Sequence, residues 1–284
     1  MFVVPQPEFA GPHQDGGCPV WLSQTEPQGI GIHAMLDSPA IYRQMNAGTL
    51  AFIVAVLLPC GLGWAQQPPA VVFPEVDRAL DAVFAEIAAE QARFTEPRQP
   101  QDKEWVKRRL AHLYNVDQMV RGAYFMKPRP AEWSSAAREY YGKKLANRMV
   151  ALDQAHTAEL KELLKLYRWF KVSEFGEKGD LHAWVLVQHS DRDPAFQQEV
   201  LAILTTLYAS GETDGNSYAN LYDRVAYNAG RPQRYGTQGR CAGPGKWEPF
   251  EIEDPANLDQ RRASAGLSTM AAYLQRSIDR GYCP

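Results

Sequence analysis

A histidine and two aspartates follow one another closely near residue 190, and these residue types can carry out proton transfer. His189 ends a strongly apolar stretch and is followed by Asp191 and Asp193. A histidine beside carboxylates can act as a general base or as a metal ligand. An imidazole can equally cap the last carbonyls of a helix, where the helix dipole favours positive charge. Both interpretations of His189 stay open, whereas Asp193 before Pro194 favours a helix N-cap.

Two further pairs of charged residues occur within segments of helical periodicity. Asp117 and Arg121 are four residues apart, a spacing that commonly gives an ion pair on one face of a helix. Asp223 and Arg224 are adjacent, so their side chains point about 100° apart around a helix and need different partners. For Asp223, both a buried ion pair with another helix and a substrate-binding carboxylate are consistent with the sequence.

The run GRPQRYGTQ at residues 230–238 is the most unusual segment of the chain. Gly236 permits a backbone conformation or a close approach that a larger residue forbids. Four side chains of the run supply amides and hydroxyls: Gln233, Tyr235, Thr237 and Gln238. Neutral hydrogen-bonding groups beside aromatic rings suit a polar uncharged ligand such as a sugar or a peptide. The alternative is that these groups satisfy buried backbone where the helices meet a hairpin.

Most of the chain after residue 74 has the hydrophobic periodicity of helices, which predicts a mainly α-helical domain with a small β-hairpin near the C-terminus. We expect helices over residues 74–93 and 105–120, and a long one from the turn at residues 127–130 to about Tyr167. A break in the long helix is expected near Asp153, where Thr157 can cap a new start. The apolar segment 180–188 is the best candidate for a central buried helix.

The second half of the chain has clear start and stop signals. Asp193 followed by Pro194 predicts a helix that extends to about residue 210, and residues 230–232 stop the next one. Residues 233–238 and 246–253 flank a glycine-rich turn and are predicted to form the hairpin. Further helix starts are expected at these positions: Asn216 or Ser217, Asp254, and Ser268 or Thr269.

The stretch from residue 169 to residue 238 resembles a bacterial family of helical domains known only as a domain of unknown function. The motifs of that family are QHxDxDPxFQ, LxDRV and GRPQxYGTQ, which the chain matches at residues 188–197, 221–225 and 230–238. Four upstream residues also match the pattern: Asp117, Gln118, Arg121 and Asp153. The resemblance extends over about residues 75–280, and it implies a helical fold and a shared site without implying an activity.

One position departs from the pattern of that family. Arg168, Trp169 and Phe170 stand where the family tends to have Gly-Trp-Pro. We therefore expect the turn at Arg168 to differ in this chain.

Asp153, His156 and His189 are possible ligands of a metal site. Asp153 and His156 are three residues apart, so both can lie on one face of a helix and ligate a metal together with His189. However, His156 and His182 are not evident parts of the family pattern. We therefore expect no metal and no other cofactor.

The N-terminal part of the chain has the composition of a leader rather than of a folded domain. Residues 1–44 are expected to be a mis-assigned start or a disordered leader, and residues 45–65 a signal peptide with an uncharged core from Leu50 to Ala65. Residues 66–74 would be a tether and residues 75–284 the helical domain. An uncleaved N-terminal anchor and a lipoprotein at Cys60 are the alternatives. We expect an exported protein, periplasmic or extracellular, whose mature chain has no stable membrane span.

Export changes the interpretation of the cysteines. Cys18 and Cys60 precede the predicted cleavage site, which leaves Cys241 and Cys283. Two cysteines in an oxidising compartment predict a single disulfide, worth about 4 kcal/mol in the chain-entropy model. A reactive thiol pair is the alternative, although neither cysteine belongs to a CxxC motif.

Composition and charge exclude several classes of protein. The 284 residues are 45% hydrophobic and 22% charged with a formal net charge of −3, which excludes a disordered chain and a polytopic membrane protein. Residues 1–65 hold four acids and one base, which account for that whole charge. The chain therefore lacks the basic character of a nucleic-acid-binding protein.

The leading functional hypothesis is an exported helical domain with a polar pocket that catalyses metal-independent hydrolysis. His189 would be the base, helped by Asp223, and Arg121 or Arg224 would stabilise developing negative charge. Binding roles in this pocket are expected for these residues: Asp117, Gln118, Asp153, Asp191, Gln233, Tyr235, Thr237 and Gln238. The alternative is a non-catalytic periplasmic module that uses the same groups to bind a ligand or a protein.

Overall fold

The computed structural model describes residues 73–127, 129–279 and 283. The predicted leader and signal peptide, and the predicted tether up to residue 72, lie outside these residues. All the described residues belong to one compact unit, and its first helix begins at Pro74, where the tether was expected to end.

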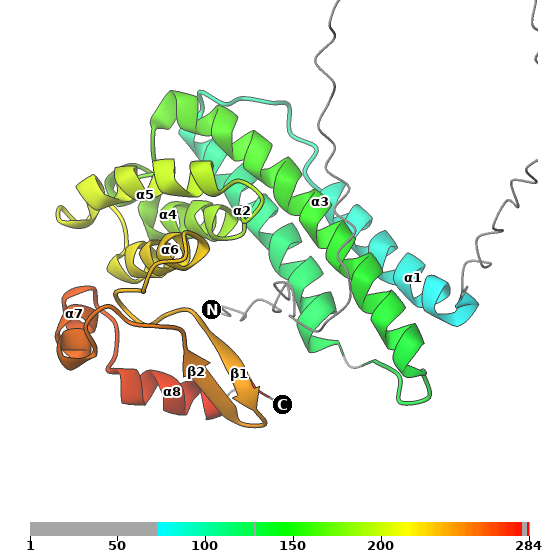
Figure 1. Cartoon of the computed structure of the whole chain (residues 1–284). Coiled ribbons are helices and arrows are strands. Elements are labelled where there is room, and N and C mark those ends of the chain that lie inside the picture. Colours follow the sequence, from blue (N-terminus) through cyan, green and yellow to red (C-terminus); the bar gives the residue numbers. More distant parts are fainter. Residues whose placement is uncertain (1–72, 128, 280–282, 284) are drawn as a thin grey trace, which may run out of the picture. The chain divides into compact units, whose positions relative to one another are not determined.

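The described residues form eight α-helices and a two-stranded antiparallel hairpin near the C-terminus, which confirms the predicted fold class (Figure 1). The α-helices are α1 (Pro74–Gln91), α2 (Lys103–Arg121), α3 (Ser135–Tyr167), α4 (Val172–Gln188), α5 (Pro194–Tyr208), α6 (Gly215–Asn228), α7 (Leu258–Ser264) and α8 (Met270–Asp279). A π-helical turn, η2 (Gly122–Met126), continues α2, and a 3-10 turn, η3 (Pro255–Asn257), precedes α7. The strands are β1 (Gly239–Gly243) and β2 (Lys246–Pro249).

Side-chain caps mark the starts of α5 and α6, one as predicted and one at another residue. The Asp193 side chain accepts a hydrogen bond from the Phe196 N–H, so the predicted start of α5 is confirmed. For α6 the predicted cap at Asn216 or Ser217 is wrong. Asp214 is the cap and accepts from the Ser217 N–H at 3.0 Å, which is the third N–H of the helix and a usual partner of an aspartate cap.

The helix α3 is continuous from Ser135 to Tyr167, so the predicted break near Asp153 is wrong. Thr157 does not cap a new helix, because its hydroxyl donates to the Asp153 carbonyl one turn earlier at 2.7 Å. The helix α4 begins earlier than predicted and contains a non-helical residue, Gly176, with φ 74°. Its segment after this glycine is the predicted central helix, and most of that segment is buried.

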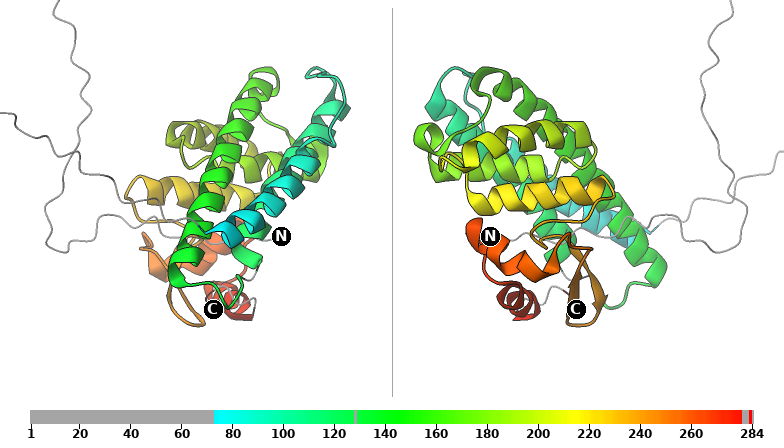
Figure 2. Two further views of the ribbon diagram at one scale, coloured as in Figure 1. Left: turned by 90° about the vertical axis from the view of Figure 1, so that its right-hand side faces the viewer. Right: turned by 60° about the vertical axis from the view of Figure 1, so that its left-hand side comes forward.

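Two hydrophobic clusters meet along α2. One joins α1 to the second half of α2 and the first half of α3, and the other joins the first half of α2 to α4, α5 and α6. The two groups of helices can be followed in Figure 1, and the right-hand view of Figure 2 shows α4, α5 and α6 side by side. The polar residues of α2 that follow Val116 therefore lie where the two clusters join.

The hairpin lies further along the chain than predicted. Residues 233–238 are not its first strand but a loop, and β1 begins directly after them at Gly239. Gln233 forms an isolated bridge with Ile252. The prediction was wrong because the loop N–H groups are bound by a side chain, Asp223, rather than by a neighbouring strand.

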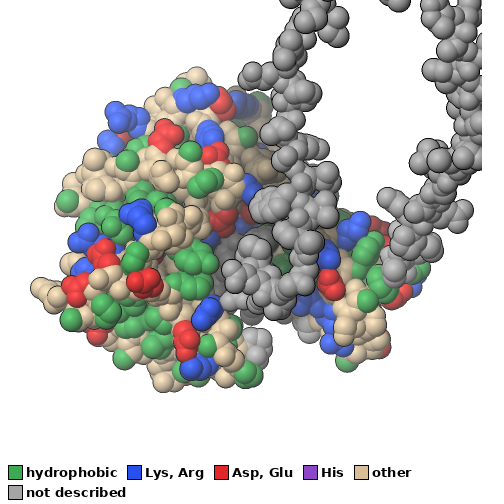
Figure 3. Space-filling view, viewed as in Figure 1, with side chains coloured by type: hydrophobic (Ala, Val, Ile, Leu, Met, Phe, Trp, Pro, Cys, Tyr) green, Lys and Arg blue, Asp and Glu red, His purple; other side chains and the backbone are tan. Residues whose placement is uncertain are grey.

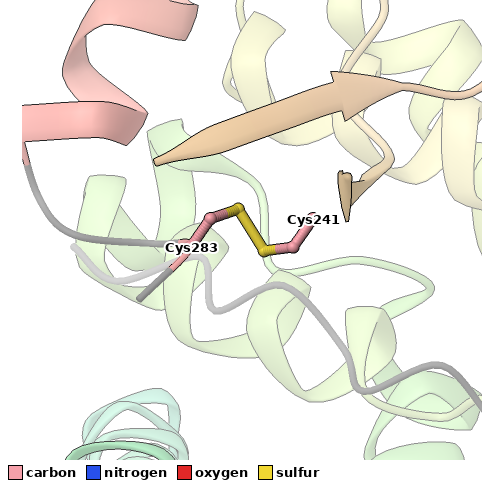
Figure 4. The surroundings of a disulfide bond; sticks show 2 residues. All are labelled: Cys241 and Cys283. Atoms are coloured by element: carbon pink, nitrogen blue, oxygen red, sulfur yellow. A yellow bond between two sulfur atoms is a disulfide. The ribbon is translucent and has the colours of Figure 1, made fainter. Parts of the chain in front are cut away.

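The predicted disulfide is present between Cys241 and Cys283 (Figure 4). Their Cα atoms are 5.4 Å apart, and the bond links β1 to a residue beyond α8. The Gly245 N–H also donates to the Cys283 carbonyl at 2.6 Å. The segment that contains α7 and α8 is therefore closed into a covalent loop with the hairpin.

Two observations bear on the classes of protein that the composition excludes, nucleic-acid-binding and polytopic membrane proteins. Acidic and basic side chains are interspersed on the face shown in Figure 3. Within the described part of the chain, no helix combines the length and the apolar character needed to cross a bilayer.

The turn after α3 adopts a backbone conformation that favours glycine. Arg168 has φ 58° and ψ −42°, and the Trp169 N–H donates to the Tyr167 carbonyl at 2.6 Å. This is a γ-turn of positive φ, a rare and strained conformation for a residue with a β-carbon. The turn places Trp169 and Phe170 in the core, where both are fully buried. Arg168 thus holds a strained conformation at the position where the resemblance led us to expect glycine.

We expect Arg168→Gly to raise the free energy of unfolding by about 1 kcal/mol, because the relief of strain exceeds the extra entropy of glycine in the unfolded chain. Thermal unfolding of the oxidised protein should then show a melting temperature higher by about 2–4 °C. Arg168→Ala is the matched control, since it removes the guanidinium but keeps the β-carbon and should give no increase. A lower melting temperature for Arg168→Gly would contradict the assignment of strain.

Candidate functional site

Four polar residues meet where α2, α3 and the end of α4 converge, and we call Asp117, Arg121, Asp153 and His189 the His189 cluster. Asp117 accepts from Arg121 Nη1 at 2.7 Å, and its oxygen Oδ1 lies 2.9 Å from His189 Nδ1. Arg121 Nη2 donates to both oxygens of Asp153 at 3.1 Å. The predicted pair of Asp117 and Arg121 is therefore present, and it is buried rather than on the surface.

Helical spacing places these side chains together. Asp117 and Arg121 lie one turn apart on α2, and Asp153 lies on the face of α3 that packs against α2. His189 follows the last residue of α4 and is its C-cap residue. It therefore occupies the expected capping position, while its ring nitrogen binds the carboxylate of another helix.

Within the His189 cluster one guanidinium serves two carboxylates. Burial acts to raise the pKa of Asp117, but His189 and Arg121 outweigh it and hold this pKa at about 2. Gln118 adds a hydrogen bond from its Nε2 to Asp117 Oδ2 at 2.8 Å. For Asp153 burial prevails over the attraction of Arg121 and raises the pKa to about 7. Asp117 is therefore ionised throughout the neutral pH range, whereas Asp153 changes between its protonated and ionised forms near neutral pH.

The imidazole of His189 is neutral at neutral pH and has a defined tautomer. Burial, followed by the charge of Arg121, lowers the pKa of His189, although Asp117 acts in the opposite direction. Because an ionised carboxylate can only accept, Nδ1 carries the proton that it donates to Asp117. Nε2 is then the basic nitrogen, and no hydrogen bond to it is found among the described residues. This arrangement is that of a general base oriented by a buried carboxylate.

His189 and Asp153 share the wall of a cavity of about 200 Å³. The cavity is lined by Asp153, Gln154, Thr157, Ala158, Lys161, His189, Ser190, Arg192 and Asp193. Among the described residues that line it, neither Arg121 nor Arg224 occurs, whereas Lys161 and Arg192 supply positive charge. A bound molecule would therefore meet an imidazole, a protonatable carboxyl group, two cations and the carboxylate of Asp193, which pairs with Lys161.

Sequence reasoning did not identify Lys161, Thr157 and Ser190 as parts of this site. Asp153, Thr157 and Lys161 recur every four residues on α3, and this spacing was the available signal for Lys161. The Ser190 hydroxyl donates to the Leu186 carbonyl at 2.9 Å and lies 2.8 Å from the Thr157 hydroxyl. Ser190 is thus engaged within the protein and is poorly placed as a nucleophile.

A second polar group fixes the turn that follows His189. Arg224 Nη1 donates to both oxygens of Asp191, at 2.9 and 3.0 Å. With its amide oxygen turned toward Arg224, Gln188 accepts from Nε at 2.6 Å and from Nη2 at 3.1 Å. Gln197 Nε2 also donates to Asp191, at 3.2 Å. Arg224 therefore holds the residues on both sides of His189 and is a positioning residue.

The remaining predicted site residues form a separate structure around Asp223. Its carboxylate accepts from the backbone N–H groups of Arg234, Tyr235 and Thr237 at 2.7–3.2 Å. The Thr237 hydroxyl donates to the same carboxylate at 2.9 Å. The structure therefore places Asp117 on the imidazole of His189, and Asp223 on the loop of residues 234–237.

The amides and the ring of this loop also face inward. Gln233 Nε2 donates to the carbonyls of Gln238 and Phe250, and its Oε1 accepts from the Gln238 N–H. Tyr235 is buried among other aromatic residues. Gln238 Nε2 donates to the Thr237 hydroxyl at 3.0 Å. The polar side chains of the loop thus form hydrogen bonds with the loop itself and with the segment after β2. This arrangement agrees with the alternative that these groups satisfy buried backbone where the helices meet the hairpin.

No group of three His, Cys, Asp or Glu side chains is arranged as a metal site within the part of the chain that the structure describes. His156 is buried on α3, and burial lowers its pKa to about 4. Its ring is therefore neutral at neutral pH.

We expect mutations in the His189 cluster and at Asp223 to have different effects on stability. Asp223→Ala should reduce the free energy of unfolding by about 3 kcal/mol or more, because each buried N–H left without an acceptor costs about 1–3 kcal/mol. The melting temperature should fall by about 6–12 °C. His189→Ala should lower it by less than about 4 °C, since Asp117 keeps Arg121 and Gln118 as partners. Equal losses for the two variants would show that His189 is also a structural residue.

Comparisons with known proteins identify a family without an assigned activity. No curated protein and no solved structure matches the chain significantly. Residues 108–283, more than half of the chain, match a family of unknown function, DUF6624. The matched range includes all four residues of the His189 cluster and both cysteines of the disulfide. The chain therefore belongs to the DUF6624 family of unknown function.

Proposed function

We propose that the chain is a hydrolase in which His189 activates a water molecule and Asp153 protonates the leaving group. The observation that carries the proposal is the position of these two side chains on one small cavity, with His189 Nδ1 held by the buried Asp117 carboxylate. General acid–base catalysis requires two such groups within reach of one substrate.

His189 is suited to accept the proton of water at Nε2. The hydrogen bond to Asp117 fixes the ring and stabilises the imidazolium that forms during the reaction. The lowered pKa of His189 keeps the ring unprotonated at neutral pH. Asp117 takes the assisting role that the sequence analysis assigned to Asp223.

Asp153 is suited to donate a proton because its carboxyl group is half protonated near neutrality. Burial is the main cause of its raised pKa, and the charges of Asp117 and Asp191 add to it. Arg121 opposes this effect but is shared with Asp117. A carboxylic acid with a pKa near the working pH is an efficient proton donor.

Lys161 and Arg192 supply the positive charge that lines the cavity. Lys161 also forms an ion pair with Asp193, which anchors its ammonium at the start of α5. In this proposal these two residues stabilise the oxyanion, a role that the sequence analysis gave to Arg121 or Arg224. Neither of those arginines is among the described residues that line the cavity.

The proposed reaction on an ester balances as follows. The water oxygen attacks the carbonyl carbon while one water proton passes to His189 Nε2. The bond between carbon and the leaving oxygen then breaks, and that oxygen takes the proton of Asp153. The products are a carboxylic acid and an alcohol, and proton exchange with solvent restores neutral His189 and protonated Asp153.

We expect kcat/KM for ester hydrolysis to have a bell-shaped pH dependence. Activity should rise as His189 loses its proton below its ordinary pKa of about 6.5 and should fall as Asp153 ionises near pH 7. The charged groups that set these limits are Asp117 and Arg121 on α2, Asp191 after α4, and Arg224 on α6. The profile can be measured by pH-stat with ethyl butyrate. With p-nitrophenyl acetate, whose leaving group needs no proton, only the rise with pH should remain.

Variants separate the two roles in the same assay. His189→Gln should abolish turnover of both esters. Asp153→Asn should slow ethyl butyrate by about 10²–10⁴-fold and p-nitrophenyl acetate far less, because p-nitrophenolate leaves without a proton. Glu139→Gln, an exposed change on the same helix, is the control. Unchanged activity in His189→Gln would overturn the proposal, and ligand binding without turnover would favour a non-catalytic binding module.

A stability measurement shows whether Asp153→Asn is folded. The folded state raises the pKa of Asp153 from 3.8 to about 7, so the wild type loses stability as the pH rises through this interval. Asparagine does not titrate. The variant should therefore gain stability relative to wild type at pH 8 but not at pH 4.

We also propose that the protein is exported and cleaved after Ala65. The uncharged stretch from Leu50 to Ala65 supports this, as does a disulfide of the kind that persists in oxidising compartments. N-terminal sequencing of the protein from a periplasmic or culture fraction should begin at Gln66. Recovery of the intact leader in the membrane fraction would instead indicate an uncleaved anchor.

A further inference from the structure

A groove between the second half of α3 and α5 adjoins the His189 cavity. Its volume is about 870 Å³. Its accessible apolar lining comes from Leu164, Ala202, Ile203 and Leu207, whereas Phe196 and Val200, which also line it, are almost fully buried. Helices pack through such side chains, and an accessible apolar groove of this size is a candidate for binding the apolar part of a ligand.

The groove and the His189 cavity have a common wall. Lys161 lines both spaces, and its Nζ forms an ion pair with Asp193 of the cavity and lies 5.1 Å from the centre of the Phe196 ring of the groove. Asp193 and Phe196 are neighbours at the start of α5. A molecule could therefore extend from the cavity into the groove past one side chain.

The charges around the groove favour a ligand whose polar group lies at Lys161. All three lysines that line the groove, Lys161, Lys165 and Lys171, pair with a carboxylate, respectively Asp193, Glu162 and Glu174. Lys161 differs from the other two because it also lines the His189 cavity. The aliphatic stems of Lys165 and Lys171 can extend the apolar wall while the charged ends stay in water. At the cavity end, a ligand carboxylate would share the ammonium of Lys161 with Asp193.

The groove is also long enough for an extended chain. Lys161, Lys165 and Tyr167 line it from the last turns of α3. At 1.5 Å per residue, the distance from Lys161 to Tyr167 is about 9 Å along the helix. A short acyl group would occupy only the cavity end of this length.

We infer that the substrate is an acyl ester whose scissile bond lies at His189 and whose acyl chain lies in the groove between α3 and α5. This inference rests on the proposed hydrolase function and adds a substrate class to it. Hydrolysis then releases a fatty carboxylate beside Lys161 and Arg192, and the released alcohol carries the proton of Asp153. Each methylene buried in the groove contributes to binding, so affinity increases with chain length.

The test compares p-nitrophenyl acetate, butyrate and octanoate with the full chain. We expect kcat/KM to be at least tenfold higher for octanoate than for acetate. Ile203→Lys, which places a charge in the groove, should reduce this ratio at least fivefold. Leu166→Lys is the matched control, because Leu166 is an exposed apolar residue of α3 that is 49% accessible, and the ratio should not change.

Binding of laurate, measured by calorimetry on the His189→Gln variant, separates the two proposals. Laurate binding that is weakened at least tenfold by Ile203→Lys supports the groove even if no ester is hydrolysed, in which case only the hydrolase function fails. Hydrolysis with equal kcat/KM for all three esters, unaffected by Ile203→Lys, would overturn the acyl groove and leave the hydrolase function standing. Absence of laurate binding would also overturn it.

Discussion

The candidate site depends on the ion pairs that the guanidinium of Arg121 forms with two carboxylates. The guanidinium neutralises one buried carboxylate, Asp117, and leaves a second, Asp153, with only part of its charge. As a result, Asp117 stays ionised and accepts a hydrogen bond from the imidazole of His189, whereas the carboxyl group of Asp153 changes protonation near neutral pH. Because the three charged residues come from two helices, the packing of α2 against α3 sets these protonation states.

The helices could be predicted from the sequence because their periodicity is local, and the caps at Asp193 and Thr269 are as expected. The errors arose where a side chain made a longer-range or competing bond. Thr157 bonds backward within α3, and Asp223 replaces a strand as the partner of the loop at residues 234–237. Such competition between a side chain and the backbone is not visible in hydrophobic periodicity.

The site was predicted as one pocket and contains two separate polar groups. Spacing identified Asp117 with Arg121, and the need of Asp223 and Arg224 for different partners was also foreseen from their adjacency. The sequence did not reveal which partners these were, since the loop bound by Asp223 lies beyond the end of α6 and Asp191 lies before α5. The cavity itself depends on how α3 packs against the end of α4, which no local pattern determines.

Two adjacent residues, Asp223 and Arg224, fix the orientation of α6. Asp223 is fastened to the loop and Arg224 to the turn beside His189, in directions about 100° apart around the helix axis. Rotation of α6 about its axis would break the hydrogen bonds of both Asp223 and Arg224. The rotational position of the helix is therefore fixed. The loop that precedes the hairpin and the turn that contains His189 are therefore held in fixed positions relative to each other by one helix, α6.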